Sequence, residues 1–183
     1  MKKFQTLIMA ISLIAVSSAF GFNGNRQGFV LGGGLGIAPV STWSVESGPF
    51  GTIDESGAGI GLSFVIGHAW NEKNMIVYEG NVTGWQSDYY NMTVSQGFNG
   101  GAWYHYYAVP GNSAFTTFGL GLYLFDRESG SGNDIGPGFL AGGGFEFAKH
   151  WQVGGYLSLG RTNLGSLDFD HSHLNVLVSG LAF

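Results

Sequence analysis

Residues 58–70 read AGIGLSFVIGHAW, and the spacing of the large side chains in this stretch decides the fold. Apolar side chains stand at every second position, at Ile60, Leu62, Phe64 and Ile66. Mostly small residues lie between them: Gly61, Ser63, Val65 and Gly67. A two-residue period places the apolar side chains on one face of an extended strand. Glycine recurs too densely here for a stable helix. The stretch therefore predicts a strand with one apolar face.

The same alternation returns along the rest of the chain. It is clear in 75–85, 114–125 and 151–161, and weaker in 27–38, 92–108, 137–148 and 173–183. A tilted strand crosses a bilayer with about 9–11 residues, whereas a membrane-spanning helix needs roughly 20 apolar residues in a row. Because a bilayer offers no water to the backbone, strands can span it only as a closed barrel. The sequence predicts an all-β fold, an eight-stranded antiparallel up-and-down transmembrane β-barrel.

The composition narrows the possible function classes. The 183 residues include 33 glycines and no cysteine, and 15% are aromatic while only 10% are charged. Disordered chains are polar and poor in aromatic residues, so disorder is excluded. The lack of cysteine excludes disulfides, thiolate metal sites and cysteine nucleophiles. The formal net charge of −5 argues against a nucleic-acid partner, which would require a basic face. No cofactor is expected.

The N-terminus has the organisation of a secretory signal peptide. Lys2 and Lys3 precede an apolar stretch at 7–16, and small residues at 17–19 offer a cleavage site after Ala19. We predict a signal peptide at 1–19 and an outer-membrane barrel domain at 20–183. The alternative is an uncleaved N-terminal anchor.

Tight turns alternate with longer connections between the predicted strands. Short turns are expected at 71–74, 109–113 and 149–150, a medium loop at 86–91, and long loops at 39–57, 126–136 and 162–172. Bacterial outer-membrane barrels combine short periplasmic turns with longer outer loops. The longer connections hold most of the acidic residues. We therefore expect an acidic outer surface, with loops 39–57, 126–136 and 162–172 available to a surface partner.

The end of the chain carries a family resemblance. The final strand ends in Phe183, with Leu181 and Leu177 at alternate positions behind it. This pattern, together with the eight predicted strands, resembles the small eight-stranded bacterial outer-membrane barrels of the OmpX/OmpA type. The resemblance implies a location in the outer membrane. It also implies that Leu181 and Phe183 form the signal read by the outer-membrane assembly machinery.

Alternation also predicts which polar side chains face the lumen. The inward set includes Glu79, Asn81, Trp103, His105, Tyr123, Glu146 and Tyr156, with Asn99, Tyr107, Gln152 and Ser158. An eight-stranded barrel is just wide enough to be filled by side chains. We expect a hydrogen-bonded plug; a cavity for a small ligand or acyl chain, or a narrow water path, are the alternatives. No Lys or Arg is expected inside, which leaves His105 and tyrosine hydroxyls as partners for the buried carboxylates. Aromatic residues near strand ends are expected to meet the membrane interface, among them Trp70, Tyr104, Tyr106, Trp151 and Phe183.

The last predicted loop holds a cluster of reactive side chains. Asp168, Asp170, His171 and His173 are of the types that ligate divalent metals. His171, Ser172 and His173 are candidate catalytic residues, because a serine beside a histidine can act as a nucleophile. Lipid A deacylases are also eight-stranded barrels with His and Ser on outward strand faces, but the local motif differs here. A hydrated acidic rim is the preferred interpretation. Arg127 and Arg161 near this rim could contact lipopolysaccharide phosphates.

These observations predict an outer-membrane barrel with a largely filled lumen and a structural or interaction role, such as envelope integrity, adhesion or surface shielding, and not an enzyme. Its expected partners are outer-membrane lipid, lipopolysaccharide and the assembly machinery. The main alternative is a lipid A-modifying or lipid-binding enzyme. A solute channel is disfavoured because water-filled porins need roughly 16–18 strands. A soluble lipocalin-like carrier would need the opposite placement of apolar residues.

Overall fold

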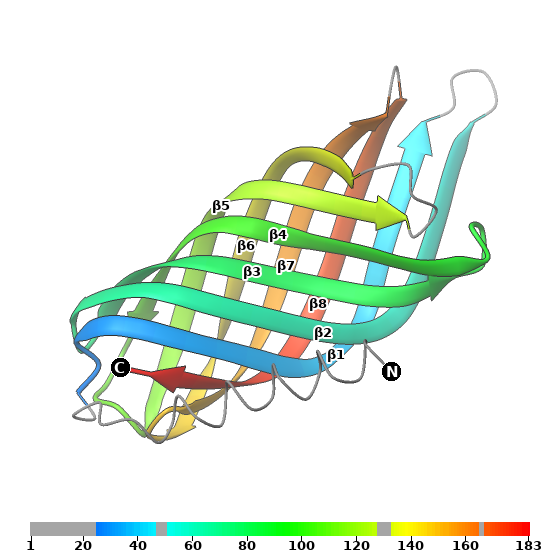
Figure 1. Cartoon of the computed structure of the whole chain (residues 1–183). Helices are drawn as coiled ribbons and strands as arrows, with labels where there is room; N and C mark the ends of the chain where they lie inside the picture. Colours follow the sequence, from blue (N-terminus) through cyan, green and yellow to red (C-terminus); the bar gives the residue numbers. More distant parts are fainter. Residues whose placement is uncertain (1–24, 47–50, 128–132, 165–166) are drawn as a thin grey trace, which may run out of the picture.

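A computed structural model describes residues 25–46, 51–127, 133–164 and 167–183, and the predicted signal peptide lies outside this range. The strands are β1 (Gly28–Glu46), β2 (Thr52–Asn71), β3 (Asn74–Ser87), β4 (Met92–Tyr106), β5 (Ser113–Arg127), β6 (Asn133–Ala148), β7 (Trp151–Leu164) and β8 (Leu167–Ala182). Each pairs antiparallel with its neighbour in the chain, and β1 pairs with β8, so the barrel is closed (Figure 1). The predicted eight-stranded up-and-down barrel is confirmed. The described residues hold no helix long and apolar enough to cross a bilayer.

The outer surface carries the apolar face that the alternation predicted. Ile60, Leu62 and Phe64 of β2 are 61%, 47% and 48% exposed. Equivalent side chains stand exposed on the other strands, for example Leu35, Ile76, Phe118, Phe139, Leu157 and Val176. At the end where β2 and β3 join by a tight turn, Phe29, Trp70 and Trp151 are also exposed. We call this ring of outward apolar residues the belt; it is the surface that a barrel presents to lipid.

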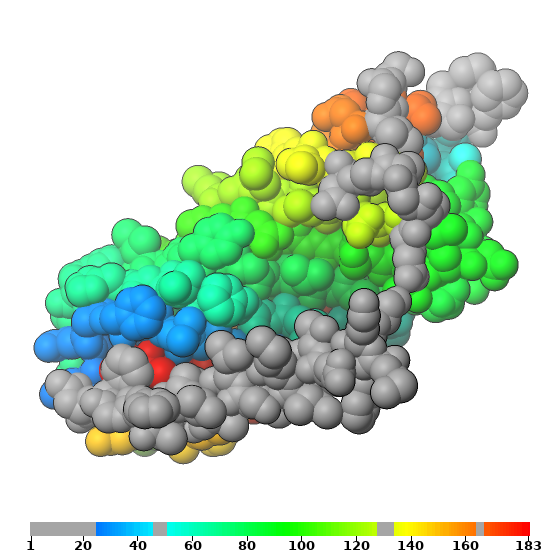
Figure 2. Space-filling model, in the orientation of Figure 1, coloured from blue at the N-terminus to red at the C-terminus, as the bar shows by residue number. Residues whose placement is uncertain are grey.

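The strands are longer than the sequence analysis predicted, and most of three predicted loops is strand. The loop expected at 39–57 belongs largely to β1 and β2, which contain 19 and 20 residues. Most of 126–136 and 162–172 likewise belongs to β5–β6 and β7–β8. The prediction failed because apolar-outward alternation stops at the end of the belt. Beyond it the strand faces water outside, so polar residues take the outward positions. The described ends of these strand pairs lie at one end of the molecule (Figure 1 and Figure 2), called the hairpin end below.

A bulge in β1 accompanies this change. The register of β1 with both β2 and β8 shifts near Pro39. Proline has no N–H to donate to a ladder, so it is tolerated at such irregular positions. The extra residue changes which positions face inward: Ala38 is buried on one side of the bulge, and Ser41 and Trp43 on the other.

In β4 the predicted inward face is wrong. Trp103 is 39% exposed and His105 lies outside the lumen with it, as do Asn99 and Tyr107, whereas Tyr104 and Tyr106 are 1% and 0% exposed. Tyr104 pairs across the ladder with Met75, which is fully buried, and this partner fixes the direction. Both faces of β4 carry aromatic rings, so the alternation of apolar and polar residues does not indicate which face points inward.

The interior is packed by two clusters of side chains. The larger one lies in the belt region and the tight-turn end, and includes Phe98, Tyr104, Tyr106, Phe115, Tyr156 and Phe183. The second lies at the hairpin end and includes Trp43, Trp85, Phe125 and Phe169. Glycines give the rings room: a Cβ at Gly160 would clash with the ring of Tyr123. Leu177, Leu181 and Phe183 face this interior and not the lipid.

Candidate functional site

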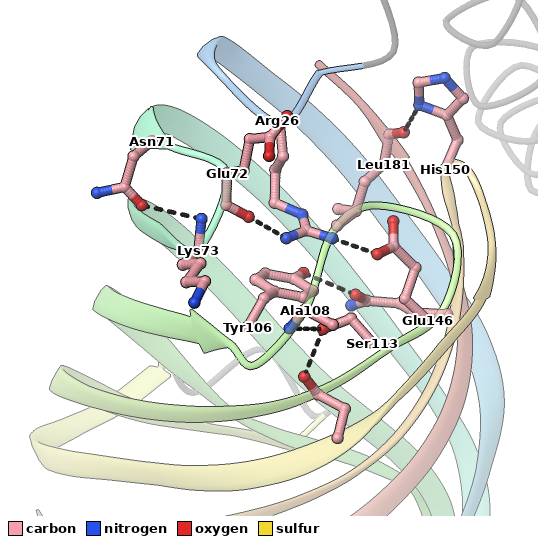
Figure 3. Close-up of polar contacts among 12 residues, drawn as sticks. Arg26, Asn71, Glu72, Lys73, Tyr106, Ala108, Ser113, Glu146, His150 and Leu181 are labelled. Atoms are coloured by element: carbon pink, nitrogen blue, oxygen red, sulfur yellow. Dashed lines mark hydrogen bonds and ion pairs between the residues drawn. The ribbon is translucent and has the colours of Figure 1, made fainter.

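The tight-turn end of the lumen is closed around Arg26, which precedes β1 (Figure 3). Its guanidinium is fully buried and donates hydrogen bonds to the Glu146 carboxylate and to the Glu72 carbonyl oxygen. It also lies over the ring of Tyr106, 3.4 Å from the centroid. A buried charge is stable only when it is paired and hydrogen-bonded. Arg26 and Glu146 satisfy this condition for each other.

This pair corrects the expectation that no Lys or Arg lies inside the barrel. His105, the predicted partner for the carboxylates, is on the outer face, where its Nδ1 lies 2.9 Å from the Asn74 side-chain oxygen. The sequence analysis missed Arg26 because it lies before the first strand, where no alternation indicates a direction. One feature of the sequence did point to it: Glu146 was predicted to be buried without a cationic partner, and a buried carboxylate requires one.

Glu79 is held by neutral donors in the belt region. The Tyr104 hydroxyl donates to its carboxylate at 2.7 Å and the Asn81 amide at 3.3 Å. Glu79 and Asn81 both face inward and are fully buried, as predicted. Tyr156, also predicted inside, accepts a 3.3 Å hydrogen bond from Gln152.

Farther toward the hairpin end, His173 joins residues from three strands. The Tyr123 hydroxyl lies 2.8 Å from its Nδ1, and the Asn81 side-chain oxygen 3.3 Å from its Nε2. Asn175 donates to the same Asn81 oxygen at 2.8 Å. Asn81 and Tyr123, both predicted to face the lumen, are thus linked through a histidine that the sequence analysis assigned to the outer loop.

Aromatic rings close the lumen at the hairpin end. The His171 ring lies 4.7 Å from Phe125 and 5.4 Å from Tyr123 between centroids, and Trp43 lies 6.1 Å from Phe169. Arg127 donates to Asp134 at 2.6 Å beside them. Arg127, predicted at the rim, therefore points into the lumen, where its guanidinium is paired with Asp134.

The candidate catalytic and metal-binding residues are not brought together. Strand pleating turns His171 and His173 inward, while Asp168, Asp170 and Ser172 lie on the other face. The Ser172 hydroxyl lies 2.7 Å from the Thr42 hydroxyl on β1, and among the described residues it makes no hydrogen bond to a histidine. A serine nucleophile needs its base within hydrogen-bond reach. Within residues 25–183, apart from the gaps named above, no three His, Asp or Glu side chains gather as a metal site would require.

Outside the belt, two carboxylates are fixed by hydrogen bonds. Glu55 accepts from the Ser87 hydroxyl at 2.6 Å, from the Trp43 indole at 2.9 Å, and from the backbone N–H groups of Asp88 and Tyr89. Burial alone would raise the pKa of Glu55, but these bonds outweigh it and lower the pKa below its usual value. Asp170 accepts two hydrogen bonds from Arg161, at 2.7 and 2.9 Å, which lower its pKa.

No family model and no curated protein matches the sequence. Among solved structures, the chain resembles Neisserial surface protein A, with a TM-score of 0.51, 12% identity, and coverage of 90% of this chain and 100% of that one. It resembles Ail, the attachment invasion locus protein of Yersinia pestis, with a TM-score of 0.50, 11% identity, and coverage of 84% and 99%. The chain has the fold of the small bacterial outer-membrane barrels. The outer-membrane protein OprG from Pseudomonas aeruginosa gives a TM-score of 0.49 at 11% identity, covering 86% of this chain and 96% of that one.

The fold of an outer-membrane barrel implies an orientation in the membrane. Short turns of such barrels face the periplasm. In that orientation the cluster around Arg26 would lie at the periplasmic mouth, and the ring cluster around Trp43 would lie above the outer leaflet. The apolar belt between them is the part that spans the membrane.

Proposed function

We propose that this outer-membrane barrel has a structural and surface-interaction role, in envelope integrity, adhesion or surface shielding, performed by its hairpin end. One observation carries the proposal: the strands continue past the belt and are packed inside by rings from β1, β3, β5 and β8. Such packing makes the hairpin end a rigid platform. Most of its outward side chains are polar, and Asp54, Asp88 and Asp126 are exposed on it. Tyr89, Ile135 and Leu167 are exposed there as well.

Export and assembly follow the same proposal. A signal peptide at 1–19 would direct the chain across the inner membrane. Leu181 and Phe183 would then be read by the assembly machinery before the barrel closes. Both are buried after closure, and the Phe183 ring lies 4.6 Å from that of His150. The signal is therefore accessible only while the last strand is unpaired.

The arrangement of side chains supports interaction over catalysis. The hydroxyl of Ser172 is engaged with Thr42, and His171 is stacked among rings. Passage of solutes is opposed by the side chains packed across the lumen at both ends.

A deletion strain complemented with wild-type protein or with the triple variant Asp54→Asn, Asp88→Asn, Asp126→Asn tests the proposal. The variant should keep the heat-modifiable band of a folded barrel but lose the surface phenotype, measured as adhesion to a charged surface and as resistance to bile salts. Sugar uptake by reconstituted vesicles, or an altered lipid A mass spectrum that Ser172→Ala restores, would overturn it.

A further inference from the structure

The outer surface of β4 interrupts the apolar belt. Each outward position from 93 to 101 on this strand holds a polar residue or glycine: Thr93, Ser95, Gly97, Asn99 and Gly101. Asn99 nevertheless lies at the level of the belt, because it pairs with Leu122 on β5 and with Gly80 on β3. Leu122 is exposed, as is Phe64 of β2, which pairs with Gly80 in turn. At this level β4 presents an amide, whereas its neighbours present apolar side chains to lipid.

The Asn99 amide is only partly satisfied by its own chain. Its oxygen accepts a hydrogen bond from the Tyr78 hydroxyl at 3.3 Å and lies over Gly80. Within the described ranges this is the one hydrogen bond of the Asn99 side chain, so both N–H groups of the amide lack an acceptor. An unpaired polar group in hydrocarbon is costly, and acyl chains offer no acceptor. A protein surface with an acceptor at the same depth would remove this cost.

Gly101, the next outward position, leaves room for such a surface. A Cβ at Gly101 would meet no atom within 4 Å, so packing within the barrel does not require glycine there. Glycine inside a strand often marks a place where another backbone approaches closely. Gly155 on β7 is equally open, but its cross-strand neighbours Gly143 and Val176 carry no hydrogen-bonding side chain. Of these two open glycines, Gly101 is the one that lies beside an unpaired amide.

We propose that the outer face of β4 binds the same face of a second copy of this chain, with the two Asn99 side chains paired across a two-fold axis. Both copies have the same orientation in the membrane, so the axis runs along the membrane normal and a residue on it meets its own equivalent. An amide carries donors and an acceptor with two lone pairs, so each Asn99 can donate to the oxygen of the other while that oxygen keeps its bond from Tyr78. This self-complementarity favours a second copy over an unrelated protein.

The small residues beside Asn99 suit this arrangement. Strands tilted by about 40° to the membrane normal cross their equivalents in such a pair at about 80°. Crossed strands approach most closely at one place, and small residues there let the two backbones come near each other. Gly97 and Gly101 flank Asn99 along the outward face of β4 and provide that closeness. The contact lies in the membrane-spanning wall, so it adds a partner that the role proposed for the hairpin end does not require.

Sedimentation equilibrium in density-matched micelles tests the pairing. The wild type should show a reversible equilibrium between monomer and dimer. Asn99→Leu removes the amide and should raise the dissociation constant of the dimer about tenfold, the effect of one net hydrogen bond. Gly101→Leu places a bulky side chain at the contact without straining the barrel, and should abolish the dimer. Gly155→Leu is the matched control, because its side chain also projects into open space, and it should leave the dimer unchanged.

Cross-linking in the outer membrane of the producing cell identifies the occupant. The chain has no cysteine, so Gly101→Cys introduces a single thiol. A reagent that joins this thiol to any neighbouring residue on illumination should give a product of twice the monomer mass, and Gly155→Cys should not. A product of another mass, or equal effects of Gly101→Leu and Gly155→Leu, would overturn the proposal.

The dimer and the role of the hairpin end can fail separately. Every variant is first checked for the heat-modifiable band of a folded barrel. A wild type that is monomeric in micelles and in the membrane, yet keeps its surface phenotype, would overturn the dimer and leave the proposed function in place. Loss of that phenotype with an intact dimer would do the reverse.

Discussion

Arg26 and Glu146 form an ion pair inside the barrel, although they are 120 residues apart in the chain. The pair connects the segment before β1 with β6, on the far side of the ring of strands. Arg26 also bonds the turn between β2 and β3 and covers Tyr106. One side chain thus ties together parts of the barrel that the strand ladders do not connect directly.

Removing this cation should be costly. Arg26→Ala leaves the Glu146 carboxylate buried without its partner, and breaking a buried ion pair costs about 3–5 kcal/mol. The urea midpoint of unfolding in lipid vesicles, followed by heat modifiability, measures the loss. Arg161→Ala removes an exposed pair worth about 0–1 kcal/mol and serves as the control. Equal losses in the two variants would show that Arg26 does not support the fold through charge.

Glu79 should tolerate loss of its charge. Glu79→Gln keeps an oxygen for the Tyr104 hydroxyl, so the expected cost is about 1 kcal/mol, the value of a typical hydrogen bond. Glu79→Leu leaves that hydroxyl without its acceptor and should cost more. Equilibrium unfolding of both variants tests the order. A larger loss in Glu79→Gln than in Glu79→Leu would mean that the charge itself is needed.

Gly160 should not accept a methyl group. In Gly160→Ala the new Cβ meets the ring of Tyr123, and overpacking of this kind costs about 1–3 kcal/mol. Gly155, on the same strand, has no atom within 4 Å of the position that a Cβ would take. Gly155→Ala should therefore be neutral in the same unfolding assay. Similar midpoints for the two variants would contradict the packing of Tyr123 on β7.

The joined ends of β3 and β4 should loosen in acid. The lowered pKa of Glu55 means that its ionised form stabilises the folded state. That stability is fully present above the ordinary pKa of the carboxyl group and is lost as the pH falls through the lowered pKa of the folded protein. Amide signals of Asp88 and Tyr89, followed by NMR in micelles, should show faster hydrogen exchange over this pH range. In Glu55→Gln these amides should already exchange fast at neutral pH. After correction for the intrinsic pH dependence of amide exchange, their protection should change little as the pH falls.

The sequence predicted the barrel because the belt obeys one strong rule. A lipid-facing position must be apolar, and residues such as Ile60, Leu62 and Phe64 record that rule at every second place. The rule also places Glu79, Asn81 and Tyr123 inside. It fails in β4, because Trp103 and Tyr104 lie on opposite faces and either is suited to face lipid. It does not apply to Arg26, which precedes the strands.

The neighbours of Ser172 could not be predicted from the sequence either. Leu120, Phe139, Leu159, Ser172 and Thr42 form one row across five strands, and one sequence fixes no register between strands. Ser172 was named a candidate catalytic residue because histidines flank it in the chain. Its actual neighbour, Thr42, lies on a strand at the opposite end of the sequence.

The bulge near Pro39 has a consequence for how the chain meets water. On one side of it β1 turns Leu35 and Ile37 outward, as a membrane protein does; on the other it turns Trp43 inward, as a soluble protein does. The two halves of one strand are thus suited to different surroundings, lipid before the bulge and water after it. The position where the large apolar side chains change from the outer to the inner face marks the edge of the membrane on β1, and the protein structure alone locates it.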